Sequence, residues 1–154
     1  MIRSIAADEV EQTGVLDLVW RVFEEFEAPE YAADGIREFR DFIAADAVKA
    51  RMSANELLLW GCWEDDEIVG MIATKPPCHV ALLFVDKNYH RRGIAKSLYH
   101  TALDYYIGNS TYNEMTVNSS PYAVEIYHKL GFVDVSGEQT VNGLRFVPMK
   151  HVFR

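Results

Sequence analysis

The chain lacks long hydrophobic runs and the segments that direct a protein to a membrane or out of the cell. Its longest unbroken apolar run covers residues 80–85, far short of the roughly 18 residues that a membrane span needs. No basic flank followed by an apolar region marks a secretory signal. No repeat, linker or low-complexity segment divides the 154 residues. We therefore expect a soluble, cytoplasmic protein with a single domain over residues 1–154.

Cysteine is scarce, and the histidines form no metal-binding motif. Cys62 and Cys78 lie in apolar, strand-like contexts without a CxxC pairing. Buried free thiols are therefore favoured over a disulfide or a catalytic thiol. The five histidines show neither HxxxH nor HExxH spacing, so we expect no metal.

The sequence also lacks an excess of positive charge. Its formal net charge of −8 argues against a nucleic-acid binder, because such proteins neutralise phosphates with basic surfaces. The charge fits a small cationic partner better, and we expect neither nucleic acid nor a membrane as a partner. The nucleotide-binding motifs GxxxxGK[ST] and GxGxxG are missing as well.

Hydrophobic periodicity in the first half of the chain predicts a mixture of helices and strands. We expect a strand at residues 2–6, a helix at about 9–27 opened by an Asp8–Glu11 capping box, and a second helical period from 36 to about 51. Strands at 57–63 and 68–73 are separated by EDDE, which is typical of a hairpin turn. The apolar run at 80–85 indicates a central strand that is covered on both faces.

The second half continues the alternation. Apolar residues at helical spacing predict a helix from residue 95 to about 108, followed by a short strand at 114–117. Ser120 and Pro121 begin another helix, which Gly131 ends in a left-handed conformation. Asn142-Gly143 between two strand-like runs is a strong hairpin signal.

Residues 90–97, HRRGIAKS, connect the expected buried strand to the expected helix that follows it. The first N–H groups of a helix have no intrahelical partner and lie at the positive end of its dipole. Gly93 allows the backbone to approach a phosphate, and Arg91, Arg92 and Lys96 add positive charge. This turn therefore suits a diphosphate. The alternative is a tight turn with solvated basic side chains.

Two blocks of the sequence resemble the GNAT superfamily of N-acetyltransferases. The stretch His90-Arg91-Arg92-Gly93-Ile94-Ala95 is similar to the family's pyrophosphate loop Q/RxxGxG/A, with His90 in place of the first Gln or Arg. The second block runs from Asn118-Ser119-Ser120-Pro121-Tyr122-Ala123 to Tyr127-His128-Lys129-Leu130-Gly131-Phe132. The resemblance covers about residues 82–132, and the expected order of elements agrees with the family's fold.

The resemblance implies a mixed α/β fold. Its central sheet is mostly antiparallel, with about seven strands flanked by about four helices, and it splays in the middle to hold acyl-CoA. The implied activity is transfer of acetyl from acetyl-CoA to a primary amine of a small molecule or peptide, by direct attack in a ternary complex. No metal is implied. Exposed final strands are compatible with a homodimer.

The resemblance also implies roles for individual residues. The loop would bind the diphosphate, backbone groups of the preceding strand would pair with the pantetheine arm, and the Asn118 amide would contact the same arm. Tyr127 would be the general acid that protonates the departing CoA thiolate. The implied cofactor-binding residues are Phe84, Val85, His90, Arg91, Arg92, Gly93, Ile94, Ala95, Lys96, Asn118 and Tyr127. Alternatively, Asn118 only caps a strand end and Tyr127 only fills an apolar helix face.

The sequence indicates the residues that would bind and deprotonate the acceptor amine less specifically. His79, Glu67 and Glu114 are candidates for the base that deprotonates the amine, and a water chain is another route. An acidic cluster before Tyr31 consists of Glu24, Glu25, Glu27 and Glu30. This cluster would attract a cation such as a polyamine, a lysine side chain or an aminoglycoside. Alternatively, it is a solvated helix end.

Two other functions stay open from the sequence. The first is a non-catalytic acyl-CoA sensor on the same fold. The second is an unrelated α/β protein whose basic turn binds a nucleotide or phosphate.

Overall fold

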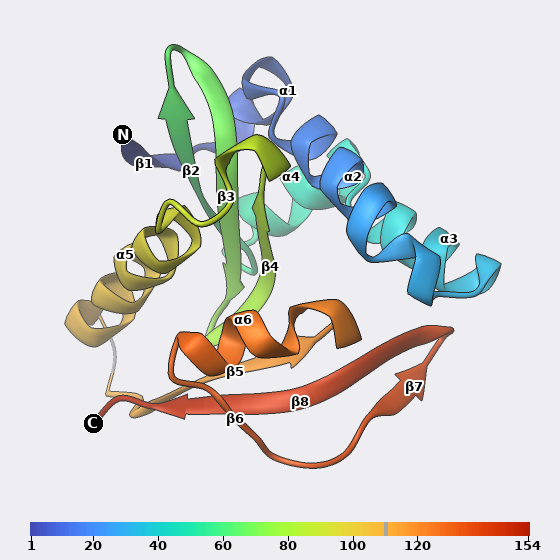
Figure 1. Ribbon diagram of the computed structural model, residues 1–154. Coiled ribbons are helices and arrows are strands. Elements are labelled where there is room, and N and C mark those ends of the chain that lie inside the picture. The colour runs from blue at the N-terminus through green and yellow to red at the C-terminus, as the bar shows by residue number, and fades with distance from the viewer. Residues whose placement is uncertain (110) are drawn as a thin grey trace.

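The strands follow the expected order along the chain. The computed structural model describes residues 1–109 and 111–154. Its strands are β1 (Ile2–Ile5), β2 (Leu58–Glu64), β3 (Glu67–Lys75), β4 (His79–Val85), β5 (Glu114–Ser119), β6 (Val133–Asp134), β7 (Gln139–Val141) and β8 (Leu144–Val152). Within these residues they form one sheet in the order β1-β2-β3-β4-β5-β8-β6, with β7 paired to β8 (Figure 1). The sheet is antiparallel except between β4 and β5, so the expected mostly antiparallel sheet is confirmed.

Both predicted hairpins are present because their turns are encoded locally. Asp65 and Asp66 join β2 to β3 with φ of 50° and 65°. Asn142 and Gly143 join β7 to β8 with φ of 52° and 80°. Two successive left-handed residues match the right-handed twist of the strands they connect. The two-residue strand β6 was not predicted, since it is too short to show a period.

The helices are more numerous than the expected four or so. They are α1 (Val10–Thr13), α2 (Val15–Phe26), α3 (Ala33–Phe42), α4 (Ala45–Ser53), α5 (Ile94–Asn109) and α6 (Val124–Lys129), six within the described residues. The expected helix at 9–27 is broken at Gly14, which has φ of 74°. The helical period from 36 to 51 is likewise divided at residues 43–44. Apolar spacing continues across both breaks, which is why the pattern predicted single helices.

One predicted cap is wrong and another is confirmed. The Asp8–Glu11 capping box does not form: Glu9 accepts a hydrogen bond from the Ala6 N–H at 2.9 Å, and Glu11 pairs with Lys49. At the other site, the Ser120 hydroxyl accepts from the Ala123 N–H at 3.3 Å, as the sequence predicts.

The sheet opens between its two parallel strands. β4 and β5 pair only at His79↔Thr116 and Val80↔Val117. The β3–β4 register then skips Ala81, and a bulge of this kind bends a strand. Figure 1 shows the result: β2, β3 and β4 stand upright, while β5 and β8 run across beneath them. The expected splay is therefore present, and it leaves one edge of β4 without a strand partner among the described residues.

Two hydrophobic cores hold the upright strands. Leu82 and Phe84 of β4 pack into the core beneath α2 and α3, whereas Val80 and Val85 pack into the core of α5. The prediction that this strand is covered on both faces is confirmed. Cys62 and Cys78 are buried free thiols, also as predicted. Within the described residues, no helix is both long and apolar enough to cross a membrane.

Candidate functional site

Two hollows flank the open edge of β4. One, which we call the α5 hollow, has a volume of about 410 Å³ and lies between β4, the start of α5 and α6. The other, the hairpin hollow, has a volume of about 480 Å³ and lies between β4, α3 and the β7–β8 hairpin. The two share five lining residues, Glu27, Leu83, Phe84, Ala123 and Tyr127. Two ligands placed in the hollows would therefore meet at this junction.

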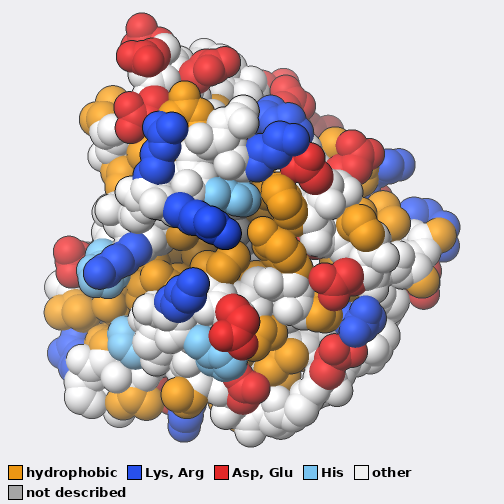
Figure 2. All heavy atoms as spheres, in the orientation of Figure 1, with side chains coloured by type: hydrophobic (Ala, Val, Ile, Leu, Met, Phe, Trp, Pro, Cys, Tyr) orange, Lys and Arg blue, Asp and Glu red, His pale blue; other side chains and the backbone are white. Residues whose placement is uncertain are grey.

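The loop before α5 forms one end of the α5 hollow. Arg91 and Gly93 both have left-handed backbones, with φ of 65° and 78°. The first helical bond runs from the Ser97 N–H to the Gly93 carbonyl at 3.0 Å, so the N–H groups of residues 94–96 precede the helical ladder. Figure 2 shows lysine and arginine side chains gathered over this connection. N–H groups at a helix start and nearby cations together suit an anion.

The open edge of β4 forms one wall of the same hollow. The Asp86 N–H donates to the Val69 carbonyl of β3 at 2.8 Å. Because the backbone groups of a strand alternate in direction, the N–H and C=O of Phe84 also face β3, whereas those of Leu83 and Val85 face the open edge. The backbone groups expected of Phe84 are therefore offered by Leu83, while the Phe84 side chain packs into the core beneath α2 and α3.

His90 has a positioning role in this arrangement. Its Nε2 lies 2.7 Å from the Val85 carbonyl oxygen, and its ring lies 5.4 Å from the ring of Phe26 at the end of α2. The side chain thus ties the loop to β4 and occupies the Val85 carbonyl. A glutamine or arginine side chain also supplies an N–H donor, so the replacement at this position keeps the donor.

Two expected cofactor-binding residues lie away from the α5 hollow. The Arg92 guanidinium stacks 4.8 Å from the centre of the Tyr89 ring and lines a separate hollow beside the Arg21–Asp86 ion pair. Asn118 is exposed on β5 and lines the hairpin hollow. Of the implied loop residues, His90, Arg91, Gly93, Ile94, Ala95 and Lys96 do line the α5 hollow.

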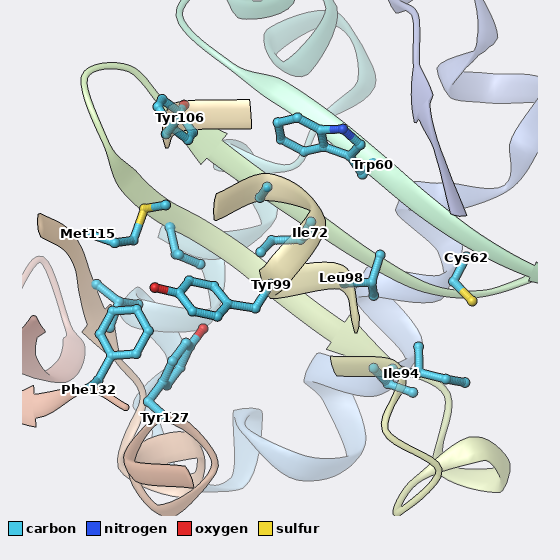
Figure 3. Packing of buried hydrophobic residues seen from close by; sticks show 14 of the residues in the cluster. Trp60, Cys62, Ile72, Ile94, Leu98, Tyr99, Tyr106, Met115, Tyr127 and Phe132 are labelled. Carbon is cyan, nitrogen blue, oxygen red and sulfur yellow. The ribbon is translucent and has the colours of Figure 1, made fainter. Parts of the chain in front are cut away.

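Tyr127 reaches the junction from α6. Its side chain is buried, and its ring lies edge-on to Phe132 at 5.4 Å. Figure 3 shows Tyr127 and Tyr99 facing each other beside Phe132. Burial, and then the nearby charge of Glu27, raise the pKa of the Tyr127 phenol. The phenol therefore keeps its proton at neutral pH.

Glu27, at the end of α2, is the residue at the junction whose importance the sequence did not indicate. The pKa of its carboxyl is raised to about 7, mainly by burial. A hydrogen bond from Ser120 opposes this rise in pKa, and the charge of Glu30 adds to it. A carboxyl with a pKa near neutrality exchanges a proton readily at the pH of the cell. Glu27 looked in the sequence like its neighbours Glu24, Glu25 and Glu30.

The base candidates from the sequence are less well placed. His79 lines the hairpin hollow, but its Nδ1 lies 2.8 Å from the Thr116 hydroxyl. Burial, and then Lys75, lower the pKa of His79 to about 4, so its neutral imidazole is a weak base. Glu67 borders the separate Arg21 hollow, and Glu114 lies 3.8 Å from the Lys150 ammonium.

The acidic cluster does not act as one surface. Glu25 pairs with Lys87 at 2.9 Å, and Glu30 lies 4.0 Å from the Arg145 guanidinium. Of the four glutamates, Glu27 is the one that lines the hollows described above.

Comparison with known families agrees with this geometry. A sequence profile described as "Acetyltransferase (GNAT) domain" matches residues 27–153. The chain therefore belongs to the GNAT acetyltransferase family, and the resemblance of the loop and of the second block is confirmed. Membership supports acyl transfer with an acyl-CoA donor. No curated protein sequence matches the chain.

Solved structures show the same fold at low sequence identity. A GCN5-related N-acetyltransferase from Rhodopseudomonas palustris is 19% identical, with a TM-score of 0.79 over 99% of this chain and 95% of its own. PaiA N-acetyltransferase from Thermoplasma acidophilum, in complex with coenzyme A, is 18% identical, with a TM-score of 0.79 over 99% and 98%. An aminoglycoside 6'-N-acetyltransferase complexed with coenzyme A is 13% identical, with a TM-score of 0.67 over 99% and 96%.

Proposed function

We propose that the protein transfers the acetyl group of acetyl-CoA to a primary amine, with acetyl-CoA in the α5 hollow and the amine in the hairpin hollow. The observation that carries this proposal is the junction of the two hollows at Glu27 and Tyr127. A donor and an acceptor that enter from opposite sides meet there directly, which suits attack in a ternary complex.

The α5 hollow offers each part of acetyl-CoA a suitable partner. The N–H groups of residues 94–96, with Arg91 and Lys96, face the diphosphate. The open-edge backbone groups of Leu83 and Val85 pair with the pantetheine amides, as an added strand would. Since His90 already contacts the Val85 carbonyl at 2.7 Å, Val85 offers its N–H to a pantetheine amide. The Leu83 N–H, at the junction of the two hollows, polarises the acetyl carbonyl.

Glu27 and Tyr127 then move the protons. Ionised Glu27 takes a proton from the acceptor ammonium, and the neutral amine attacks the thioester carbonyl carbon. The C–N bond forms, the C–S bond breaks, and Tyr127 gives its proton to the CoA sulfur. The tyrosinate recovers a proton from the amide nitrogen, which still carries one in excess, and Glu27 releases its own to solvent.

The two groups are electrostatically coupled in a useful direction. The negative charge of the Glu27 carboxylate raises the pKa of Tyr127. Once Glu27 has accepted the amine proton it is neutral, and this part of the increase in the Tyr127 pKa disappears. The phenol is thus the stronger acid at the stage when the thiolate departs. Proton uptake at Glu27 favours proton release at Tyr127.

An assay of CoA release with and without amine tests the proposal. We expect a panel of primary amines to accelerate CoA release from acetyl-CoA and to gain one acetyl group each by mass spectrometry. Binding of acetyl-CoA with no turnover for any amine would instead support a non-catalytic acyl-CoA sensor.

A further inference from the structure

The hairpin hollow has aromatic walls. Tyr31, Phe39 and Phe42 line it from the helical side, and Phe146 lines it from β8. Its volume of about 480 Å³ falls within the roughly 300–1,000 Å³ of small-molecule pockets. These walls favour an acceptor with an apolar body of the size of an aromatic ring.

Charges of both signs line the hollow. Its acidic residues are Glu27 and Glu38, and its basic residues are Lys75 and Arg145, while His79 is neutral because its pKa is lowered to about 4. Arg145 is already paired with Glu138 at 2.9 Å. The Lys75 ammonium lies 5.2 Å from the centre of the Phe42 ring, without an acidic partner in the described chain. One acceptor ammonium finds Glu27, but a further ammonium group meets the positive charge of Lys75.

A clamp between the hairpin and the α2–α3 connection closes one side of the hollow. The Tyr31 hydroxyl donates to the Arg145 carbonyl at 3.2 Å, and the Arg145 guanidinium donates to the Glu30 carbonyl at 3.1 Å. At the tip of the hairpin, Gly35 and Gly143 touch so closely that a methyl group on Gly35 would overlap the Gly143 carbonyl. The clamp therefore limits the bulk of an acceptor.

We propose that the acceptor is a compact monoamine with an apolar, aromatic-sized body, and that polyamines and aminoglycosides are poor acceptors. This inference rests on the proposed function and specifies its substrate class. The aromatic walls select the body, the Lys75 ammonium repels extra ammonium groups, and the clamp excludes wide polycationic sugars.

Steady-state kinetics with three probe amines test the inference. At fixed acetyl-CoA and ionic strength, we expect kcat/KM for 2-phenylethylamine to exceed that for spermidine and for kanamycin by about tenfold or more. A Lys75→Glu variant replaces this positive charge with a negative one, so the ratio of kcat/KM for spermidine to kcat/KM for 2-phenylethylamine should rise by about tenfold. Lys150→Glu, an equal charge change outside the hollow, should leave the ratio unchanged. Calorimetric acetyl-CoA binding checks that both variants are folded.

The outcomes separate the two proposals. Faster turnover of spermidine or kanamycin than of phenylethylamine, or a ratio that Lys75→Glu does not move, would overturn the inference and leave the acetyltransferase function intact. Turnover of none of the three, nor of any other primary amine, would overturn the proposed function and the inference with it.

Discussion

At the scale of the residue, Tyr127 is the group that the proposed chemistry places at the departing sulfur. Tyr127→Phe removes the hydroxyl and keeps the ring that packs against Phe132 at 5.4 Å. We expect kcat to fall by about 100-fold with CoA affinity nearly unchanged, measured by steady-state kinetics and calorimetry. Unchanged turnover would show that Tyr127 only fills the core.

Glu27 should govern the pH dependence of the reaction. It must be ionised to accept a proton, and burial raises its pKa to about 7. We therefore expect kcat/KM to fall as the pH drops below about 7. This inflection is well separated from the pKa of an alkyl amine, which is near ~10. Glu27→Gln should lower the rate and remove this inflection. An inflection that persists in the variant would assign it to another group.

The same carboxyl should make the folded protein less stable as the pH rises. Folded Glu27 keeps its proton up to about pH 7, whereas an unfolded glutamate loses it near ~4.3. The folded state thus binds more protons between these values, so the free energy of unfolding falls across this window. In thermal melts, Glu27→Gln should gain stability relative to the wild type from pH 5 to pH 8. A difference that stays constant with pH would contradict the raised pKa.

The adjacent arginines of the loop provide a matched pair. Arg91 lines the α5 hollow. Arg92 instead stacks on Tyr89 and lines the separate hollow beside the Arg21–Asp86 ion pair. We expect Arg91→Ala to weaken CoA binding by about fivefold to tenfold, the loss of one charge-assisted contact, and Arg92→Ala to have little effect. Equal losses measured by calorimetry would mean that both side chains reach the diphosphate.

Short-range patterns point to most of the candidate site but not to all of it. The loop at 90–96 and Tyr127 lie within motifs whose spacing is visible in the sequence. Glu27 acquires its raised pKa from burial at the end of α2, and the Ser120 hydrogen bond that partly opposes this shift comes from a segment remote in the sequence. No local signal separates it from Glu24, Glu25 or Glu30.

At the scale of the element, two helical glycines should respond in opposite ways. Alanine is a better helix former than glycine by about 1 kcal/mol, and at Gly108 in α5 the added methyl group meets open space. Gly108→Ala should therefore raise the melting temperature slightly. In α3, Gly35→Ala should lower it, because the methyl group overlaps the Gly143 carbonyl. A stabilised Gly35→Ala protein would contradict the close contact of the clamp.

Elements were predictable where the signal is local. The turns at Asp65-Asp66 and Asn142-Gly143 need left-handed residues, and their sequences show it. The break at Gly14 was missed because Val15, Leu18 and Val19 continue an apolar face that tertiary packing then buries. A single glycine is compatible with a helix as well as with its end.

At the scale of the whole molecule, the splay between β4 and β5 creates both hollows. Periodicity alone does not predict it, because it depends on how far two strands remain paired, and here the pairing stops after Val80↔Val117. The family resemblance implied the splay, and the register confirms it. The charged residues of the hairpin hollow come from four separate segments, so their proximity is visible in the folded chain alone.

The most direct measurement is a calorimetric titration of the purified protein with acetyl-CoA, with CoA, ATP and phosphate as comparison ligands. We predict selective micromolar binding of acetyl-CoA and CoA, because the open edge of β4 recognises the pantetheine arm as well as the loop recognises the diphosphate. Absence of acetyl-CoA binding, or tighter binding of ATP, would contradict the assignment of the α5 hollow as an acyl-CoA site.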